Sequence, residues 1–165
     1  MIPLEIERKF LIEQTHSLWE NCSEEIGIVQ IYLKRDDPGT QRRVRSWKTG
    51  GAEKYFYTEK RFISAAVREE NEREISREDF LQLKNEADPS LVPIEKTRLI
   101  LPFEGQRFEA DVYAFEKRLA TMELELSSEN QEIRLPPFVK VIREVTGEKA
   151  YSNAVLAASG FPAEG

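Results

Sequence analysis

Hydrophobic and polar residues alternate with a period of two along most of the chain, a pattern typical of β-strands in an antiparallel sheet. Turn-forming pairs such as Gly50-Gly51 and Glu104-Gly105 lie between the alternating segments. The eight segments are 4–12, 28–34, 41–48, 53–62, 68–76, 93–101, 106–115 and 121–127. The sequence therefore predicts a sheet of about eight antiparallel strands rather than a helical bundle.

The sequence predicts three or four short helices beside this sheet. Three lie over 15–25, 77–87 and 151–159, and a fourth could be a short turn capped by Ser128 that ends before Pro136. Ser76 is a suitable N-cap for the second helix, and Gly160 is a suitable end for the third. No internal repeat or linker divides the chain, so we expect one α+β domain over residues 1–165.

Charged residues fall on one face of each predicted strand, with an apolar strip on the other face. Side chains two residues apart in a strand point the same way, so Glu5, Glu7 and Lys9 share a face opposite Ile6. Charges are grouped in the same way on the later strands. These groups are Arg43 and Arg45; Thr58 and Lys60; Glu70, Glu72 and Glu74; Lys96 and Arg98; Glu109 and Asp111; and Glu123 and Glu125.

Two arrangements of the sheet agree with this pattern. For any single strand, the simpler one is an open sheet with one face in water. Like charges two residues apart repel each other unless an opposite charge lies among them, so their repetition on many strands is less ordinary. Eight strands can also close into a barrel that holds the charged face inside and the apolar face outside, under the helices.

The chemistry of the charged pairs indicates what such a barrel would bind. Carboxylate pairs suit the hard cations Mg²⁺ or Mn²⁺. Arginine pairs suit phosphate or carboxylate, because the guanidinium group offers forked donors. A closed barrel with both kinds of pair predicts a metal-bound polyphosphate as its ligand.

Overall composition narrows the possible partners. With 24 Lys+Arg against 30 Asp+Glu, the net charge of −6 argues against broad binding to nucleic acid or to an anionic membrane. The charged N-terminal segment and the lack of a long apolar run make the cytoplasm the expected compartment. The only cysteine, Cys22, and the only histidine, His16, argue against an internal disulfide, a zinc site or a histidine-based triad.

The order of the charged segments resembles a known family. Glu5-Ile6-Glu7-Arg8-Lys9 is similar to the N-terminal Glu-x-Glu-x-Lys signature of the CYTH proteins, also called triphosphate tunnel metalloenzymes. That signature is unspecific alone, but further segments follow in the family order over about residues 2–157. They are 30–33, 43–45, 58–60, Arg68 with Glu70 and Glu72, 95–98, 109–112, 123–125, 144–146, and Tyr151 with Asn153.

The resemblance implies an eight-stranded antiparallel β-barrel, the triphosphate tunnel, with flanking helices. It also implies metal-dependent hydrolysis of inorganic triphosphate, a small-molecule substrate, without nucleic acid or membrane as a partner. A homodimer is common among such barrels. Thiamine triphosphatase or adenylyl cyclase activity in the same tunnel is one alternative. A module that binds polyphosphate or nucleotide without turnover is another, and an interaction domain built on an open sheet is a third.

By the same resemblance, each predicted site residue receives a role. The ligands of Mg²⁺ or Mn²⁺ would be Glu5, Glu7, Glu123 and Glu125, assisted by Glu70, Glu72 and Asp111. The triphosphate would contact Lys9, Arg43, Arg45, Lys60, Arg68, Lys96 and Arg98. Lys96 matches the lysine suggested to activate water, and Tyr32 is the competing catalytic candidate. Residues 138–143 would belong to a segment that covers or closes the tunnel.

Overall fold

The computed structural model describes residues 4–163. In this range the strands are β1 (Leu4–Glu13), β2 (Glu24–Leu33), β3 (Thr40–Thr49), β4 (Ala52–Phe62), β5 (Val67–Ile75), β6 (Ile94–Phe103), β7 (Gln106–Tyr113), β8 (Leu119–Leu126) and β9 (Val141–Glu144). The helices are α1 (His16–Asn21), α2 (Arg77–Leu83) and α3 (Asn153–Ser159), with the 3₁₀ turns η1 (Lys84–Glu86) and η2 (Lys149–Tyr151).

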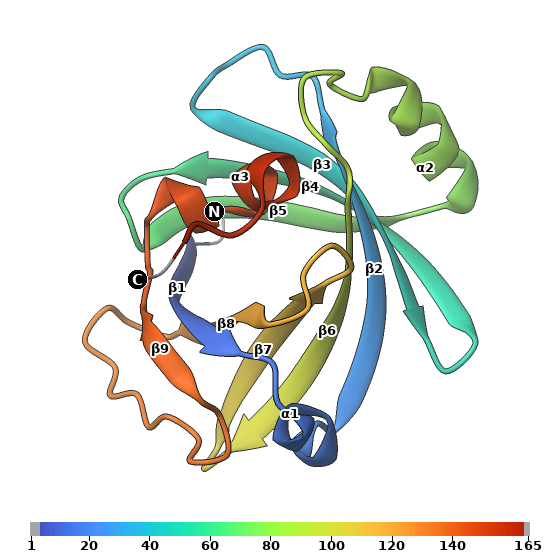
Figure 1. Ribbon diagram of the computed structural model, residues 1–165. Coiled ribbons are helices and arrows are strands. Elements are labelled where there is room, and N and C mark those ends of the chain that lie inside the picture. The colour runs from blue at the N-terminus through green and yellow to red at the C-terminus, as the bar shows by residue number, and fades with distance from the viewer. Residues whose placement is uncertain (1–3, 164–165) are drawn as a thin grey trace.

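The first eight strands close into an antiparallel barrel (Figure 1). Their order is β5-β4-β3-β2-β6-β7-β8-β1, and β1 pairs with β5 to complete the circle. This closing seam is short and runs from Leu4, opposite Glu69, to Ile6, opposite Val67. The predicted eight-stranded barrel is confirmed, and the open-sheet alternative is wrong.

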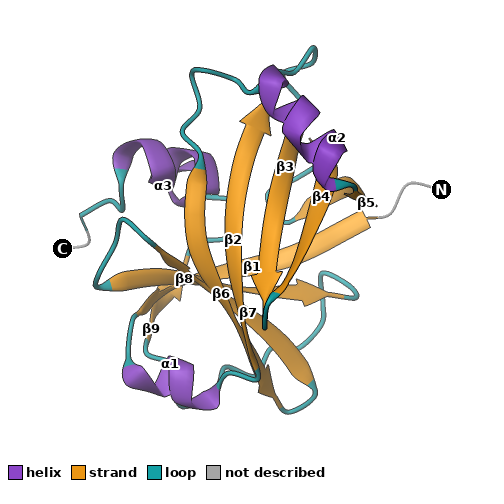
Figure 2. Ribbon diagram, turned by 90° about the vertical axis from the view of Figure 1, so that its right-hand side faces the viewer, coloured by secondary structure: helices purple, strands orange, loops and turns teal. Residues whose placement is uncertain are grey.

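Two apolar cores lie on the outer face of the barrel, as the strand parity predicts. On β1, β6, β7 and β8, side chains such as Phe10 and Phe108 pack with Leu18 of α1 and with Val139. On β2, β3 and β4, side chains such as Val44 pack under Phe80 of α2. Figure 2 shows α1 and α2 at separate places around the strands.

A third core fills one end of the lumen itself. Leu11, Tyr32 and Tyr113 have inward parity and are almost completely buried. Tyr151 of η2 and Leu156 of α3 pack against them, so the C-terminal segment blocks this end of the barrel with apolar side chains. The charged side chains of the lumen therefore lie in the part of the barrel that this apolar core does not fill.

One predicted helix needs correction. The helix expected over 15–25 ends at Asn21, because Glu24 and Glu25 begin β2, in which Ile26 and Ile28 alternate with exposed residues. The helices expected over 77–87 and 151–159 are present, and the Ser76 side chain accepts a hydrogen bond from the Asp79 N–H at 3.0 Å.

The segment expected to cover or close the tunnel, residues 138–143, lies along the barrel wall. Phe138 and Val139 pack on the outer apolar face, and the chain then forms β9 beside β1. β9 pairs with Phe10–Ile12 of β1, beyond the short contact between β1 and β5. The backbone edge that β5 leaves free is therefore occupied by β9.

No helix among the described residues is long and apolar enough to cross a membrane.

Candidate functional site

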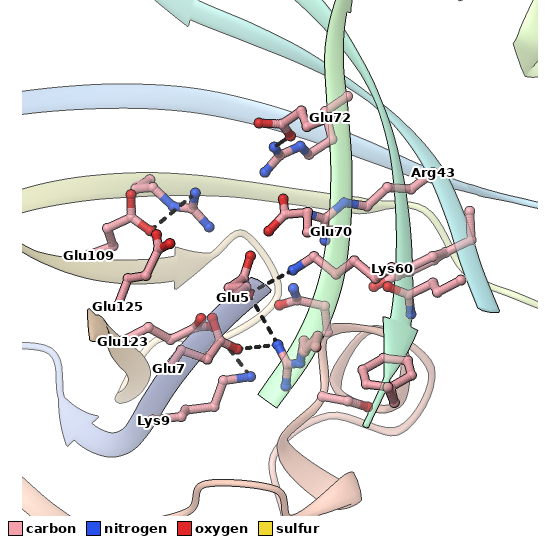
Figure 3. A pocket seen from close by; sticks show the side chains of 18 of the residues that line it. Glu5, Glu7, Lys9, Arg43, Lys60, Glu70, Glu72, Glu109, Glu123 and Glu125 are labelled. Carbon is pink, nitrogen blue, oxygen red and sulfur yellow. Dashed lines mark hydrogen bonds and ion pairs between the residues drawn. The ribbon is translucent and has the colours of Figure 1, made fainter. Parts of the chain in front are cut away.

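A cavity of about 210 Å³ lies in the charged part of the lumen (Figure 3). Thirteen of the fifteen predicted site residues line it. They are Glu5, Glu7, Lys9, Tyr32, Arg43, Arg45, Lys60, Arg68, Glu70, Glu72, Arg98, Glu123 and Glu125. The two that do not line it are Lys96 and Asp111.

Four of these carboxylates come from two neighbouring strands and form what we call the acidic wall: Glu5 and Glu7 of β1, and Glu123 and Glu125 of β8. The register places Glu7 opposite Glu125 and Lys9 opposite Glu123. Burial and the neighbouring Glu7 raise the pKa of Glu123, and burial and Glu5 raise the pKa of Glu125. On the β8 side, Glu123 has Lys9 as its cationic partner, whereas Glu125 makes no ion pair among the described residues.

Cations from other strands partly neutralise the β1 side of the acidic wall. Lys60 Nζ lies 3.2 Å from Glu5 Oε1, and Arg68 Nη1 donates a hydrogen bond to Glu7 Oε1. Burial alone would raise the pKa of Glu5, but Lys60 and the neighbouring Glu7 together outweigh it, so the pKa is lowered. Lys9 Nζ lies 3.5 Å from Glu123 Oε1 and donates to the Tyr151 carbonyl at 3.0 Å.

Four cationic side chains form what we call the basic wall: Arg43 and Arg45 of β3, Lys60 of β4 and Arg98 of β6. Arg45 is 4% exposed, and burial and Arg43 lower its pKa to about 9. Burial and Arg43 likewise lower the pKa of Lys60 to about 8. The Nε atoms of Arg43 and Arg45 are buried and have no hydrogen-bond partner. Arg45, Lys60 and Arg98 each have a carboxylate partner, whereas Arg43 makes no hydrogen bond or ion pair among the described residues.

The acids of β5 lie beside the basic wall in the same cavity. Glu72 accepts hydrogen bonds from Arg45 and from Thr58 Oγ1, the latter at 2.8 Å. Glu70 lines the cavity and makes no hydrogen bond or ion pair within residues 4–163. Glu74, on the same face of β5, is exposed and lies outside the cavity lining.

Lys96 and Asp111 lie behind the cavity, where they form a buried cluster with Arg98. Lys96 Nζ lies 2.7 Å from Asp111 Oδ2, and Arg98 Nε lies 2.9 Å from Asp111 Oδ1. Burial lowers the pKa of Lys96 to about 8, although Asp111 opposes the shift. Both oxygens of Asp111 are thus occupied by cations, and Arg98 connects this cluster to the cavity.

Tyr32, the other predicted catalytic residue, does reach the cavity. Its Oη accepts a hydrogen bond from Gln30 Nε2 at 2.9 Å, and burial raises its pKa to about 12. The phenol is therefore protonated at neutral pH, and its own hydrogen is available to another acceptor.

Further residues that line the cavity were not predicted. Gln41, Trp47 and Phe62 have the same parity as the predicted cations of β3 and β4, so the pattern of alternation could have identified them. Ser152 and Asn153 come from the C-terminal segment and reach the cavity only through tertiary packing. The alternation in the strands does not mark them as lumen residues, although Asn153 is one of the residues that carry the family resemblance.

The acidic wall is chemically suited to a hard divalent cation. Among the described residues, no three Asp, Glu, His or Cys side chains are already grouped as a metal site. The donors are nevertheless carboxylate oxygens on adjacent strands, which is the chemistry that Mg²⁺ and Mn²⁺ prefer. The raised pKa values of Glu123 and Glu125 indicate that added positive charge would stabilise their ionised forms.

Comparison with solved structures gives relatives for this barrel. The inorganic triphosphatase NE1496 is 30% identical, with a TM-score of 0.59, and the match covers 98% of this chain and 99% of that chain. Another structure of NE1496, described as a hypothetical protein, is 31% identical, with a TM-score of 0.58 and 96% and 99% coverage. PH1819 from Pyrococcus horikoshii OT3 shares the fold at 17% identity, with a TM-score of 0.59 over 76% of this chain and 80% of its own.

No protein-family model matches the sequence, and comparison with curated proteins finds no relative. The match to NE1496 nevertheless extends over nearly the whole chain, and the family's charged segments lie in order on a closed eight-stranded barrel. The chain belongs to the CYTH, or triphosphate tunnel metalloenzyme, family.

Proposed function

We propose that this protein hydrolyses inorganic triphosphate to diphosphate and phosphate, and that the reaction depends on Mg²⁺ or Mn²⁺. The observation that carries the proposal is one small cavity with an acidic wall and a basic wall. Among the described residues, Glu125 of the first wall has no cationic partner and Arg43 of the second has no carboxylate partner. A metal complex of triphosphate supplies both charges at once. The inorganic triphosphatase NE1496, at 30% identity, supports the same substrate.

The basic wall would hold the phosphate oxygens. Arg43 and Arg45 each have a buried Nε without a partner, so they can donate to an oxyanion without giving up an existing bond at that atom. Lys60 and Arg98 add positive charge from other strands. Lys9 and Arg68 lie on the side of the cavity that the C-terminal segment lines with Ser152. Together these side chains would fix the three phosphates in one orientation.

The acidic wall would hold the cation, with Glu70 and Glu72 as additional carboxylates. A bound divalent cation neutralises phosphate charge and lowers the pKa of a bound water. Glu70 is free to serve, whereas Glu72 already accepts hydrogen bonds from Arg45 and Thr58. Asp111 would act differently from a metal ligand, because Lys96 and Arg98 occupy its oxygens and it would instead fix the Arg98 guanidinium.

In phosphoryl transfer to water, positioning and charge stabilisation supply most of the rate enhancement. Water attacks the terminal phosphorus, the bond to the bridging oxygen breaks, and a proton must leave the water. Lys96 and Tyr32 are our candidates for handling that proton. Tyr32 faces the cavity but holds its own proton tightly, so it suits a hydrogen-bond donor better than a base. Lys96 has the more suitable pKa, but it lies behind the lining residues.

A phosphate-release panel tests the proposal. Tripolyphosphate, ATP and thiamine triphosphate are each incubated with Mg²⁺, with Mn²⁺ and with EDTA. We expect the fastest release from tripolyphosphate, and none in EDTA. Tight binding of tripolyphosphate without release from any compound would contradict the enzymatic function and favour a binding module. Faster phosphate release from ATP or thiamine triphosphate would show that this compound, and not inorganic triphosphate, is the preferred substrate.

A further inference from the structure

Arg68 occupies an unusual position at the seam where the barrel closes. In the register, it lies directly opposite Glu5, which joins β5 to β1. Its Nη1 donates to Glu7 Oε1 and lies 3.5 Å from Glu5 Oε1 (Figure 3). One guanidinium group thus bridges the two carboxylates of β1.

We propose that Arg68 takes the place of the divalent cation on Glu5 and Glu7 when the cation is absent, and turns to the triphosphate when the cation binds. This inference rests on the proposed function, because it assigns a second role to a residue of the same site. It makes the binding of metal and triphosphate mutually supportive.

Arg68 and a divalent cation would compete for the same carboxylate oxygens of Glu5 and Glu7. Glu5 Oε1 is already shared by Lys60, at 3.2 Å, and Arg68, at 3.5 Å, and Glu7 Oε1 accepts from Arg68. A divalent cation on these oxygens would repel the guanidinium at short range. Glu125, in contrast, makes no hydrogen bond or ion pair among the described residues. Arg68 therefore covers one half of the acidic wall and leaves the other half open.

Arg68 has donors to spare when it leaves Glu7. A guanidinium group has five N–H donors, and Arg68 Nε is buried without a partner. The ring of Phe62 lies 5.2 Å from the guanidinium carbon and would keep the side chain nearby. Arg68 also lies at the junction between the cavity and an outer vestibule of about 610 Å³, which shares Lys9, Gln41 and Ser152 with it. A guanidinium released from β1 would thus remain within reach of a bound phosphate.

The first test measures Mn²⁺ affinity without any phosphate compound, from the free-Mn²⁺ signal in electron paramagnetic resonance. Arg68→Gln should bind Mn²⁺ about tenfold more tightly than the wild type, since a charge-assisted competitor has been removed. Arg68→Lys keeps a positive charge and should remain within about threefold of the wild type. An unchanged or weaker Mn²⁺ affinity in Arg68→Gln would overturn the proposal.

The second test asks when Arg68 contacts the triphosphate. In EDTA, calorimetry should give equal tripolyphosphate affinities for the wild type and Arg68→Gln, because Arg68 is then engaged on Glu7. At saturating Mn²⁺, the KM of Arg68→Gln for tripolyphosphate should rise about tenfold. An equal loss of affinity in EDTA would show that Arg68 binds phosphate regardless of the metal, and would also overturn the proposal.

Arg61→Gln is the matched control. Arg61 lies on the same hairpin and pairs with Glu69 at 2.7 Å, but it is mostly exposed and outside the cavity. This variant should match the wild type in both tests, and thermal unfolding of each variant checks the fold. If the wild type releases no phosphate, the proposed function fails, yet the Mn²⁺ titration needs no turnover and still decides the role of Arg68.

Discussion

The acidic wall and the basic wall of the cavity carry opposite charges, and they also differ in how their charges are compensated. In the acidic wall, the β1 carboxylates have cationic partners, whereas Glu125 has none among residues 4–163. In the basic wall, Arg45 is held by Glu72, while burial and Arg43 still depress its pKa. Neither wall is balanced by the protein alone. This difference supports the proposed ligand, a cation bound to a polyanion, because such a ligand would place a cation on one side and an anion on the other.

Removing acid from the acidic wall should have the largest effect. We expect Glu5→Ala and Glu123→Ala each to reduce Mn²⁺-dependent phosphate release on the order of a thousandfold, because a lost metal ligand removes several kcal/mol of transition-state stabilisation. Glu95→Ala is the control, since Glu95 is exposed on the outer face of β6. Unchanged rates in both cavity variants, with the fold intact by circular dichroism, would contradict the assignment of the acidic wall.

Removing charge from the basic wall should have the next largest effect. Arg45→Gln should lower kcat/KM for tripolyphosphate about a hundredfold, because a buried donor to the phosphate charge is lost. Arg42→Gln is a matched control three residues earlier on the same strand. Arg42 faces outward and contacts Tyr57 and Glu86 instead of the cavity. If both variants lose activity equally, the loss reflects damage to β3 and does not report on the wall.

The cluster behind the basic wall should respond mainly in turnover. We expect Lys96→Ala to lower kcat tenfold to a hundredfold with a smaller change in KM, since Lys96 pairs with Asp111 behind the lining residues. The measurement is the steady-state kcat and KM of Lys96→Ala, compared with those of Tyr32→Phe. A raised KM with kcat unchanged would make Lys96 a binding residue and favour Tyr32 for proton transfer.

The smallest effect should come from the contact between Gly147 and the loop around Ala65. Gly147 has a φ of +74°, and a Cβ added there would lie 2.6 Å from the Cβ of Ala65. Gly147→Ala should therefore lower the free energy of unfolding by about 2 kcal/mol, from both strain and collision.

Gly160→Ala separates the two causes of that loss. Gly160 has nearly the same φ, +73°, with nothing within 4 Å of an added Cβ, so this variant should lose only about 1 kcal/mol. Urea unfolding of both variants gives the comparison. Equal losses would show that the loop around Ala65 moves aside at no cost.

Much of the barrel could be predicted because alternation in a strand directly reports the two faces. The eight strands, the inward charges and the outward apolar strip all follow from that period of two. β9 could not be predicted, because its four residues are mostly exposed and its position depends on the edge that β5 leaves on β1. A local pattern contains no information about such a vacant edge.

The predicted site shows the same limit. The alternation of residues in the strands indicates that Lys96 and Asp111 point inward, and they do. It does not indicate whether an inward side chain reaches the cavity or stays buried behind it. Their mutual contact at 2.7 Å places them behind Arg98, outside the cavity lining. Ser152 and Asn153 reach the lining from the C-terminal segment, whose position depends on the apolar side chains that fill one end of the lumen. Depth and long-range docking are properties of the assembled barrel.

The pairing of β1 with β8 has a consequence for biosynthesis. Glu7 leaves the ribosome early, whereas its partner Glu125 leaves after seven strands have been made. Contacts between such distant parts of a chain form slowly, because a long loop must be closed first. The four glutamates therefore come together only when the last strand of the barrel is in place. We expect a nascent chain that lacks β8 to have no affinity for the cation, so Mn²⁺ binding would report that β8 has joined β1 in the barrel.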